Sequence, residues 1–332
     1  MATVTGTRRK SCPTTALEIR RLGANLGAEI SGIDLSRPLP RDTLKQLKEA
    51  MVEHEVLVFR NQPLSQQQYI DFVGRFGELT IHPFATALPD HPELIVLDND
   101  GKRPPLSTDQ WHSDEMFRDA PPWITALRCT IVPEIGGDTC FASMTAAYEG
   151  LHPSMQRFYE SLYAINDFKV FRVLYSGTHE GRQRLVDLEK RFPNLIHPVV
   201  RIHPKDKSKK AIYASPQTTK AIADVRDFES EHILHMLYQL PETPEYQLRV
   251  KWEPDMIVLW DNVSTQHYAP RDYLPYRRRM ERLTVKGWRP RDFDGKVKPR
   301  AQKMNVRGTD SDARTGQHRG GLERPSNTIF RD

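Results

Sequence analysis

The chain has 332 residues, a length that fits one large domain. Its composition, 38% hydrophobic and 27% charged, is typical of a soluble globular protein and excludes wholesale disorder. No stretch approaches the roughly 18 consecutive apolar residues of a membrane span, and the N-terminal residues lack the apolar segment of a secretory signal. The three cysteines, Cys12, Cys129 and Cys140, have no CxxC spacing, which argues against a disulfide framework or a structural zinc site. We therefore expect a cytoplasmic protein without a membrane partner.

Two helices and a strand are predicted in the first quarter of the chain. Residues 41–54 repeat apolar side chains at helical spacing, and Asp42 can cap the start of this helix. Residues 55–60 follow as a short strand. Ser65 can begin a second helix that buries one apolar stripe and ends near Gly77.

The sequence from residue 93 onward is typical of many short strands separated by Pro, Gly and Asp turns. Helical interruptions are expected around residues 144–163 and 228–239. This order predicts an α+β fold with an antiparallel sandwich or barrel and added helices. The sequence contains neither GxGxxG nor GxxxxGK[ST], the motifs typical of dinucleotide-binding and P-loop proteins, so it does not indicate either class. The expected strands cover residues 93–98, 123–132, 138–143, 199–203, 210–215, 248–252, 256–260 and 281–287.

The last part of the chain carries all of the net charge of +5. Residues 289–332 contain 11 Lys/Arg and 6 Asp/Glu, whereas the preceding residues contain 37 of each sign. We expect a catalytic domain over residues 1–288 and a polar basic extension over residues 289–332, solvated or lying on a neighbouring subunit of a homo-oligomer, a dimer or a tetramer. The extension lacks the clustered basic run and interleaved aromatics that single-stranded nucleic acid requires, so no nucleic-acid partner is predicted.

The segment STDQWHSDEMF, residues 107–117, offers metal ligands. His112 and Asp114 are two apart, so on an extended strand an imidazole and a carboxylate face the same side. Such a pair alone also fits a polar surface. A third ligand would complete a 2-His-1-carboxylate set, which leaves open positions on ferrous iron. His267 in DNVSTQHYAPRDYLP, just after the apolar strand, supplies one.

The segment PYRRRMERLTVKG places two arginines on one face of a predicted strand. Arg278 and Arg282 share that face, and Leu283 and Val285 lie on the other. If the apolar face packs under a helix, the arginines face the interior and require carboxylate partners. The alternative is a solvated run of arginines with Glu281 as its local partner.

WHSD, GGDT at residues 136–139 and WDNVSTQHYAPRDYLPYRRRMERLTVKG together resemble the taurine dioxygenase and 2,4-D dioxygenase family of Fe(II)/2-oxoglutarate oxygenases. The resemblance covers residues 15–290 in the family's order and spacing. It implies a double-stranded β-helix, a distorted jelly roll, with flanking helices. It also implies an oxidoreductase that uses Fe(II), 2-oxoglutarate and O2 to hydroxylate a small organic anion. The hydroxylated product can lose a C–O, C–S or C–N bond where the attacked carbon bears that atom.

The resemblance also implies roles for individual residues. Thr139 and Arg278 match the pair that holds the distal carboxylate of 2-oxoglutarate, and Thr108 lies where relatives place an asparagine near the cosubstrate. The implied catalytic iron ligands are His112, Asp114 and His267.

Two residues match substrate contacts of the family. Arg282 matches the residue that grips the anionic group of the prime substrate, and His82 matches a second contact. Ala85 stands where taurine dioxygenase has an aromatic hydroxyl, which argues against taurine itself. Residues 119–156 are especially similar to aryloxypropionate-type oxygenases, which favours a carboxylate over a sulfonate or sulfate.

Two hypotheses from other functional classes stay open at this point. One is a metal-binding jelly-roll sensor without catalysis. The other is a cupin-like zinc hydrolase, because His/Asp sets also bind zinc.

Overall fold

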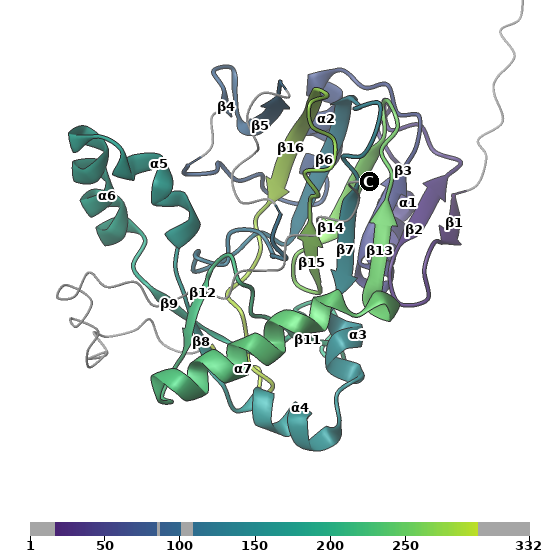
Figure 1. Ribbon diagram of the computed structural model, residues 1–332. Coiled ribbons are helices and arrows are strands. Elements are labelled where there is room, and N and C mark those ends of the chain that lie inside the picture. Colours follow the sequence, from purple (N-terminus) through teal and green to yellow (C-terminus); the bar gives the residue numbers. More distant parts are fainter. Residues whose placement is uncertain (1–16, 85–86, 101–108, 298–332) are drawn as a thin grey trace, which may run out of the picture. The chain divides into compact units, whose positions relative to one another are not determined.

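The computed structural model describes residues 17–84, 87–100 and 109–297, which all fall in one compact unit. Eight strands form the main sheet in the order β1-β2-β3-β14-β6-β16-β5-β4 (Figure 1). Neighbours in this sheet are antiparallel except for β2 and β3, which are parallel. The strands are β1 (Glu18–Arg21), β2 (Ala28–Ser31), β3 (Val56–Phe59), β4 (Ala87–Leu88), β5 (His91–Asn99), β6 (Ile124–Ile131), β14 (Ile257–Asp261) and β16 (Arg278–Val285).

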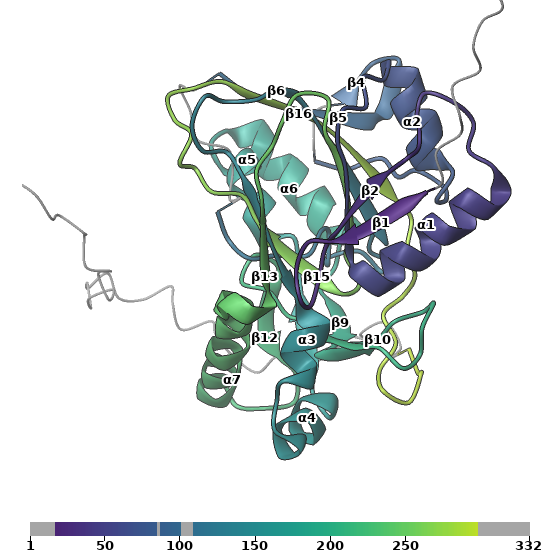
Figure 2. The same cartoon turned by 90° about the vertical axis from the view of Figure 1, so that its right-hand side faces the viewer.

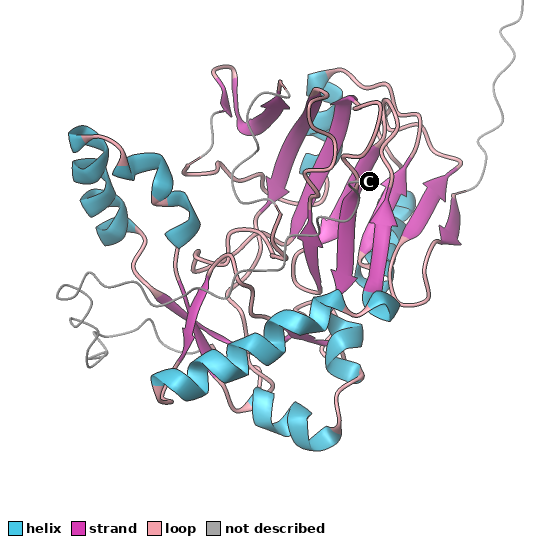
Figure 3. Cartoon of the chain, viewed as in Figure 1, coloured by secondary structure: helices cyan, strands magenta, loops and turns pink. Residues whose placement is uncertain are grey.

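A second sheet of three strands packs on the inner face of the main sheet. Its order is β13 (Gln247–Val250), β7 (Thr139–Ser143) and β15 (Thr265–Tyr268). Side chains alternate along each strand, so Val56 and Val58 of β3 share an apolar cluster with Phe141 of β7. The two sheets form the jelly-roll core predicted from the sequence (Figure 3).

Two helices cover the outer face of the main sheet (Figure 2). Helix α1 (Arg41–His54) and helix α2 (Gln66–Gly74) bury Met51 and Tyr69 in the cluster that holds Leu57 of β3. This packing buries the apolar face of each helix. Burial of apolar surface stabilises the folded state by about 25 cal/mol per Å² removed from water. The main sheet therefore lies between helices on one face and the small sheet on the other.

The ends of these helices test the predicted caps. Ser65 caps α2 and forms a capping box with Gln68, as expected for this residue type. Asp42 does not cap α1: it lies in the first turn, the cap position is Pro40, and no side chain caps the end. Helix α2 ends at Gly74, before Gly77, where a Cβ atom would lie 2.8 Å from a methyl carbon of Val285. The glycine at 77 thus permits close packing on β16 and does not end the helix.

The remaining elements pack around two further apolar clusters, one of which holds Phe168 and Leu188 (Figure 1). Strands β8 (Tyr163–Asn166), β9 (Leu195–Pro198) and β12 (Thr219–Ile222) make one sheet, and β10 (Val200–Ile202) pairs with β11 (Lys210–Ile212). The helices are α3 (Met144–Glu149), α4 (Pro153–Glu160), α5 (Val173–Ser176), α6 (His179–Arg191) and α7 (Asp227–Gln239), with 3-10 turns at Lys169–Phe171, Leu240–Glu242 and Pro244–Tyr246.

Packing contacts continue past residue 288. The backbone N–H of Ile202 donates to the carbonyl of Arg291 at 3.0 Å, and the hydroxyl of Tyr163 donates to Asp292 at 2.7 Å. Asp292 is buried. The catalytic domain predicted to end at residue 288 therefore has packed residues beyond that point, and residues 298–332 of the expected extension lie outside the described part of the chain. Among the described residues, none of the helices has the length and apolar character needed to cross a membrane.

Candidate active site

The three predicted metal ligands lie together. His112 and His267 face each other across an isolated antiparallel bridge, with backbone hydrogen bonds of 3.0 and 2.8 Å, and their ring centroids are 4.0 Å apart. Asp114 Oδ1 lies 4.0 Å from His267 Nε2. One ligand atom from each residue falls within 4.8 Å of the other two, and all three residues are buried. This is the geometry that one metal ion with three protein ligands requires.

Asp114 does not lie on the extended strand that the sequence pattern predicts. Only His112 belongs to a bridge, and residues 114–117 form a turn. The two side chains therefore converge because the backbone bends after Ser113, and not because they share a strand face.

Neighbouring groups fix the orientation of the ligands. His112 Nδ1 lies 2.7 Å from the carbonyl of Gln110, which leaves Nε2 to face an ion. Asp114 Oδ2 accepts a hydrogen bond from the Thr125 hydroxyl of β6, and the Asp114 N–H donates to Asn262 at 3.2 Å. Asn262 in turn donates to Thr125 at 2.8 Å. Partners of this kind set ligand orientation and tautomer in metal sites.

The protonation states suit a divalent cation. Burial lowers the pKa of His112 and of His267, so both imidazoles are neutral. Burial alone would raise the pKa of Asp114, but the positive charge of Arg282, the neighbouring imidazoles and the hydrogen bond from Thr125 lower it. His267 Nδ1 is buried and has no hydrogen-bond partner among the described residues. Two neutral imidazoles and an ionised carboxylate match the donor set that ferrous iron takes.

Arg278, one of the two residues predicted to bind the distal carboxylate of 2-oxoglutarate, has a buried guanidinium group. Arg278 Nε donates to the carbonyl of Gly137 at 2.9 Å, while its Nη2 is buried without a hydrogen-bond partner in the described chain. Burial lowers the pKa of Arg278, and the negative charges of Asp138 and Asp272 oppose this effect only in part. Thr139 follows Gly137 by two residues, and its oxygen accepts from the indole N–H of Trp252 at 3.0 Å, so its own proton can point to a ligand. A guanidinium nitrogen without a partner among the described residues and a hydroxyl proton that can turn to a ligand are both donors that suit a carboxylate.

Gly137 is required for this arrangement. Its φ is +74°, and an added Cβ atom would lie 2.6 Å from Pro133 and 3.1 Å from Cδ of Arg278. A larger residue would push the arginine away from its carbonyl partner.

The two predicted substrate residues meet at a third residue, Glu115. Arg282 Nη2 lies 2.8 Å from Asp114 Oδ1 and 3.5 Å from Glu115 Oε1. His82 Nε2 lies 4.0 Å from the same oxygen of Glu115, and burial lowers the pKa of His82 to about 3, which makes it a neutral imidazole. Its ring also contacts Phe171 at a centroid distance of 5.4 Å. Thr108 and Ala85 lie outside the described residues.

Glu115 is the site residue that sequence reasoning missed. It is buried, its backbone φ is +51°, and its carboxylate lies 2.5 Å from Arg118 Nε. Burial raises the pKa of Glu115, and the charges of Arg118 and Arg282 oppose that rise. In WHSDEMF the glutamate follows Asp114 directly, and strand alternation would send the two side chains apart. The left-handed backbone that turns Glu115 back toward Arg282 has no signature in the sequence.

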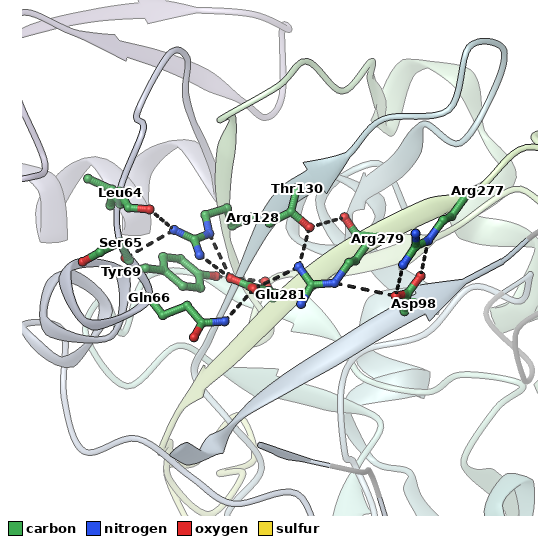
Figure 4. Close-up of polar contacts among 10 residues, drawn as sticks. All are labelled: Leu64, Ser65, Gln66, Tyr69, Asp98, Arg128, Thr130, Arg277, Arg279 and Glu281. Atoms are coloured by element: carbon green, nitrogen blue, oxygen red, sulfur yellow. Dashed lines mark hydrogen bonds and ion pairs between the residues drawn. The ribbon is translucent and has the colours of Figure 1, made fainter. Parts of the chain in front are cut away.

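The arginine run divides between two faces of β16. Leu283 and Val285 pack in the cluster beneath α1 and α2, which is the condition under which Arg278 and Arg282 face the interior. The proposed local partner, Glu281, lies on the outer face. Figure 4 shows Glu281 bound to Arg128 and to Arg279, while Arg277 pairs with Asp98. The solvated-run alternative therefore describes only the exposed Arg277, because Arg279 is half-buried and Glu281 is buried.

A groove of about 1100 Å³ lies elsewhere, between α1 and the loop that carries Lys205. Lys48, Lys205 and Trp288 line it, and none of the candidate site residues does. It is separate from the metal triad.

The sequence profile of the Taurine catabolism dioxygenase TauD, TfdA family matches residues 18–284. The chain belongs to this family. An alkylsulfatase of Acinetobacter baylyi is 34% identical over 83% of this chain and 86% of its own length. The (S)-phenoxypropionate/alpha-ketoglutarate-dioxygenase of Sphingobium herbicidovorans is 30% identical over 76% of this chain and 89% of its own length. The crystal structure of a taurine dioxygenase from Burkholderia xenovorans superposes with a TM-score of 0.72 at 31% identity, over 85% of this chain and 94% of that one.

Family membership confirms the predicted class of enzyme and the jelly-roll fold. The protein is a non-haem iron oxidoreductase, a dioxygenase that uses Fe(II), 2-oxoglutarate and O2 on a small molecule. The hypotheses of a non-catalytic sensor and of a zinc hydrolase are not supported.

Proposed function

We propose that His112, Asp114 and His267 hold Fe(II), and that Arg278 with Thr139 binds the distal carboxylate of 2-oxoglutarate. Thr108 is assigned to the cosubstrate by resemblance alone. The observation that carries the proposal is the convergence of the three ligand atoms within 4.8 Å in a buried site. The unpartnered Nη2 of Arg278 supports the cosubstrate assignment. When bound, the iron supplies the reaction of dioxygen with 2-oxoglutarate that yields succinate, carbon dioxide and a hydroxylated product.

The protein's own groups provide orientation and exclude water. The main sheet contributes Thr125, which orients Asp114, and Arg278, which would fix the far end of the cosubstrate. Both lie on strands of one rigid sheet, and a site on strands holds geometry more closely than one on loops.

The proposed prime substrate is a small organic anion bound by Arg282 and His82. Arginine presents a fork of N–H donors that matches a carboxylate, sulfonate or sulfate. Between these groups we favour a carboxylate with a bulky tail, which the relative that acts on phenoxypropionate supports. The alkylsulfatase relative supports a sulfate ester as the second candidate.

A matched series of substrates separates these candidates. Compounds with one tail and a carboxylate, sulfonate or sulfate head group should be compared for succinate release and for oxygen uptake. The proposal expects the carboxylate to give the largest stimulation. A response to the sulfate ester alone would assign the second candidate, and a response to uncharged analogues only would remove Arg282 as an anion contact.

Alanine variants test the triad. His112→Ala, Asp114→Ala or His267→Ala should abolish succinate formation and weaken Mn²⁺ binding at least tenfold, because each removes one of three protein ligands. Circular dichroism should stay like that of the wild type. His235→Ala, an exposed histidine on α7, is the matched control and should change neither quantity. Near-normal turnover in any triad variant would remove that residue from the set.

We also propose that the enzyme works in the cytoplasm as a homo-oligomer. Cys129 and Cys140 are both free in the structure, which suits a reducing compartment. Light scattering on the full chain measures the oligomeric state.

A further inference from the structure

Arg282 and a metal ion would use the same oxygen atom. Asp114 Oδ2 is occupied by the Thr125 hydroxyl, whereas Oδ1 lies 2.8 Å from Arg282 Nη2 and 4.0 Å from His267 Nε2. A divalent cation bound to Oδ1 would therefore stand beside a buried guanidinium. Like charges at short range in a site screened from water repel strongly. A further negative charge is therefore needed for the metal ion and the Arg282 guanidinium to occupy one buried site together.

Glu115 has the position and the charge for that role. Its carboxylate is the second acidic partner of Arg282, at 3.5 Å. It is 4% exposed and sits on a left-handed backbone, a conformation that is unfavourable for glutamate. Burying a carboxylate also costs free energy unless cations face it, and here Arg118 and Arg282 both do. A strained, buried carboxylate kept beside a metal triad is more costly than an apolar residue would be there.

We infer that Glu115 is a positioning residue that holds Arg282 when the metal occupies Asp114, and so lowers the electrostatic cost of metal binding. With the metal on Oδ1, the guanidinium keeps a full carboxylate partner in Glu115 and stays in the site, where it can meet the anionic group of the substrate. Arg118 anchors the other side of Glu115, and its Nη2 donates to the carbonyl of Ile81 at 2.7 Å. The inference rests on the proposed metal triad.

Direct metal titration tests the inference without reference to turnover. Mn²⁺ binding to the full chain, measured by calorimetry or by electron paramagnetic resonance, should be about tenfold weaker in Glu115→Gln, because neutral glutamine leaves Arg282 on the metal's oxygen. Arg282→Gln should bind Mn²⁺ more tightly than the wild type, since it removes the competing cation. Unchanged affinity in Glu115→Gln, or weaker binding in Arg282→Gln, would overturn the inference.

The double variant shows whether Glu115 acts through Arg282. In an Arg282→Gln background, adding Glu115→Gln should change Mn²⁺ affinity by less than about threefold, because the two sites are coupled. An undiminished tenfold loss there would mean that Glu115 attracts the metal directly, and the inference would be wrong. If Glu115→Gln does not fold, as judged by circular dichroism, the sign of the Arg282→Gln effect still decides. A wild-type chain that bound no Mn²⁺ would instead refute the proposed triad.

Discussion

Arg278 and Arg282 show how residues of one type on one strand face acquire different tasks. They are four residues apart on β16 and both point inward, yet their partners differ. Arg278 has a backbone carbonyl at one nitrogen and, within the described part of the chain, no hydrogen-bond partner at another, whereas Arg282 has two carboxylates. In the proposed function, Arg278 binds an anion that completes its hydrogen bonds. Arg282 already lies in a charged network that includes Asp114, one of the proposed metal ligands.

We therefore expect the two arginines to fail differently on substitution. Arg278→Ala should raise the 2-oxoglutarate concentration needed for half-maximal turnover at least tenfold and impair decarboxylation even without prime substrate. Arg282→Ala should chiefly weaken the prime substrate. A charged hydrogen-bonded contact contributes about 1.5–3 kcal/mol, which corresponds to tenfold or more. Succinate assays with each reactant varied in turn measure both effects.

Arg277→Ala is the matched control for this pair. Arg277 is exposed, directly precedes β16 and pairs with Asp98 on the outer face. Its loss should leave both concentration dependences unchanged. If Arg282→Ala impaired 2-oxoglutarate binding and spared the prime substrate, the division of roles between the two arginines would be reversed.

At the scale of the element, strand β16 joins the core to the site. Its inner face carries the two arginines, and its outer face carries Glu281, buried among Arg128, Arg279 and Gln66 of α2 (Figure 4). Tyr69 of α2 also donates to the carbonyl of Glu281 at 3.2 Å. This polar cluster fixes α2 on the outer face of β16. Arg278 and Arg282 lie on the opposite, inner face of the same strand.

Breaking the cluster should destabilise the protein. Arg128→Ala leaves Glu281 buried without its closest cation and should lower the free energy of unfolding by about 3–5 kcal/mol. The double variant Arg128→Met with Glu281→Gln removes both charges and should cost less than Arg128→Ala. Urea denaturation measures both values. Equal stability of Arg128→Ala and wild type would show that Gln66 and Arg279 alone satisfy the carboxylate.

The same cluster predicts a dependence on pH. Burial would raise the pKa of Glu281, but hydrogen bonds from Gln66 and Arg128 lower it below its ordinary value of 4.5. The unfolded chain therefore takes up this proton at higher pH than the folded chain does. The stabilisation by Glu281 is complete above about pH 4.5 and is lost as the pH falls through the lower folded value. Glu281→Gln should show a flatter loss of stability in acid than the wild type.

Local patterns predicted helices α1, α2 and α7 but missed the 13-residue helix α6 and several short strands. The bounds of α1 and the cap of α2 follow from helical spacing and from Ser65, because these signals lie within one turn. Strand β15 was not predicted: its four residues, TQHY, are polar, and their pairing with β7 depends on residues far away in the chain. The same limit applies to Glu115, whose inferred role depends on a left-handed backbone and on its contact with Arg282 far along the chain. His112 and His267 could be predicted without the three-dimensional structure, because histidine is a common metal ligand and both residues match motifs of the family.

At the scale of the molecule, the site depends on long-range closure of the jelly roll. His112 and His267 are far apart in sequence, and a pair of backbone hydrogen bonds joins them. The main sheet contributes Thr125 of β6 and Arg282 of β16, and the small sheet contributes His267 of β15, so the site forms only when both sheets are in place. All of the contacts described for this arrangement are made by residues up to 297.

A pair of truncations tests where the domain ends. A chain ending at residue 297 should bind Mn²⁺ and 2-oxoglutarate like the full chain, because it keeps every contact described here. A chain ending at Pro290 loses the carbonyl of Arg291 that accepts from Ile202 and the buried carboxylate of Asp292 that accepts from Tyr163. Each lost hydrogen bond costs about 0.5–1.5 kcal/mol, so this shorter chain should be less stable in urea by about 1–3 kcal/mol.

Light scattering and succinate assays on both chains complete the test. A smaller particle for the chain ending at residue 297 would show that residues 298–332 join subunits, which is a common use of polar extensions in closed oligomers. Loss of turnover in that chain, with its size and fold unchanged, would mean instead that these residues cover the active site. Equal stability of the two truncated chains would place the domain boundary at residue 288 after all, because the contacts of Arg291 and Asp292 would then contribute nothing measurable to folding.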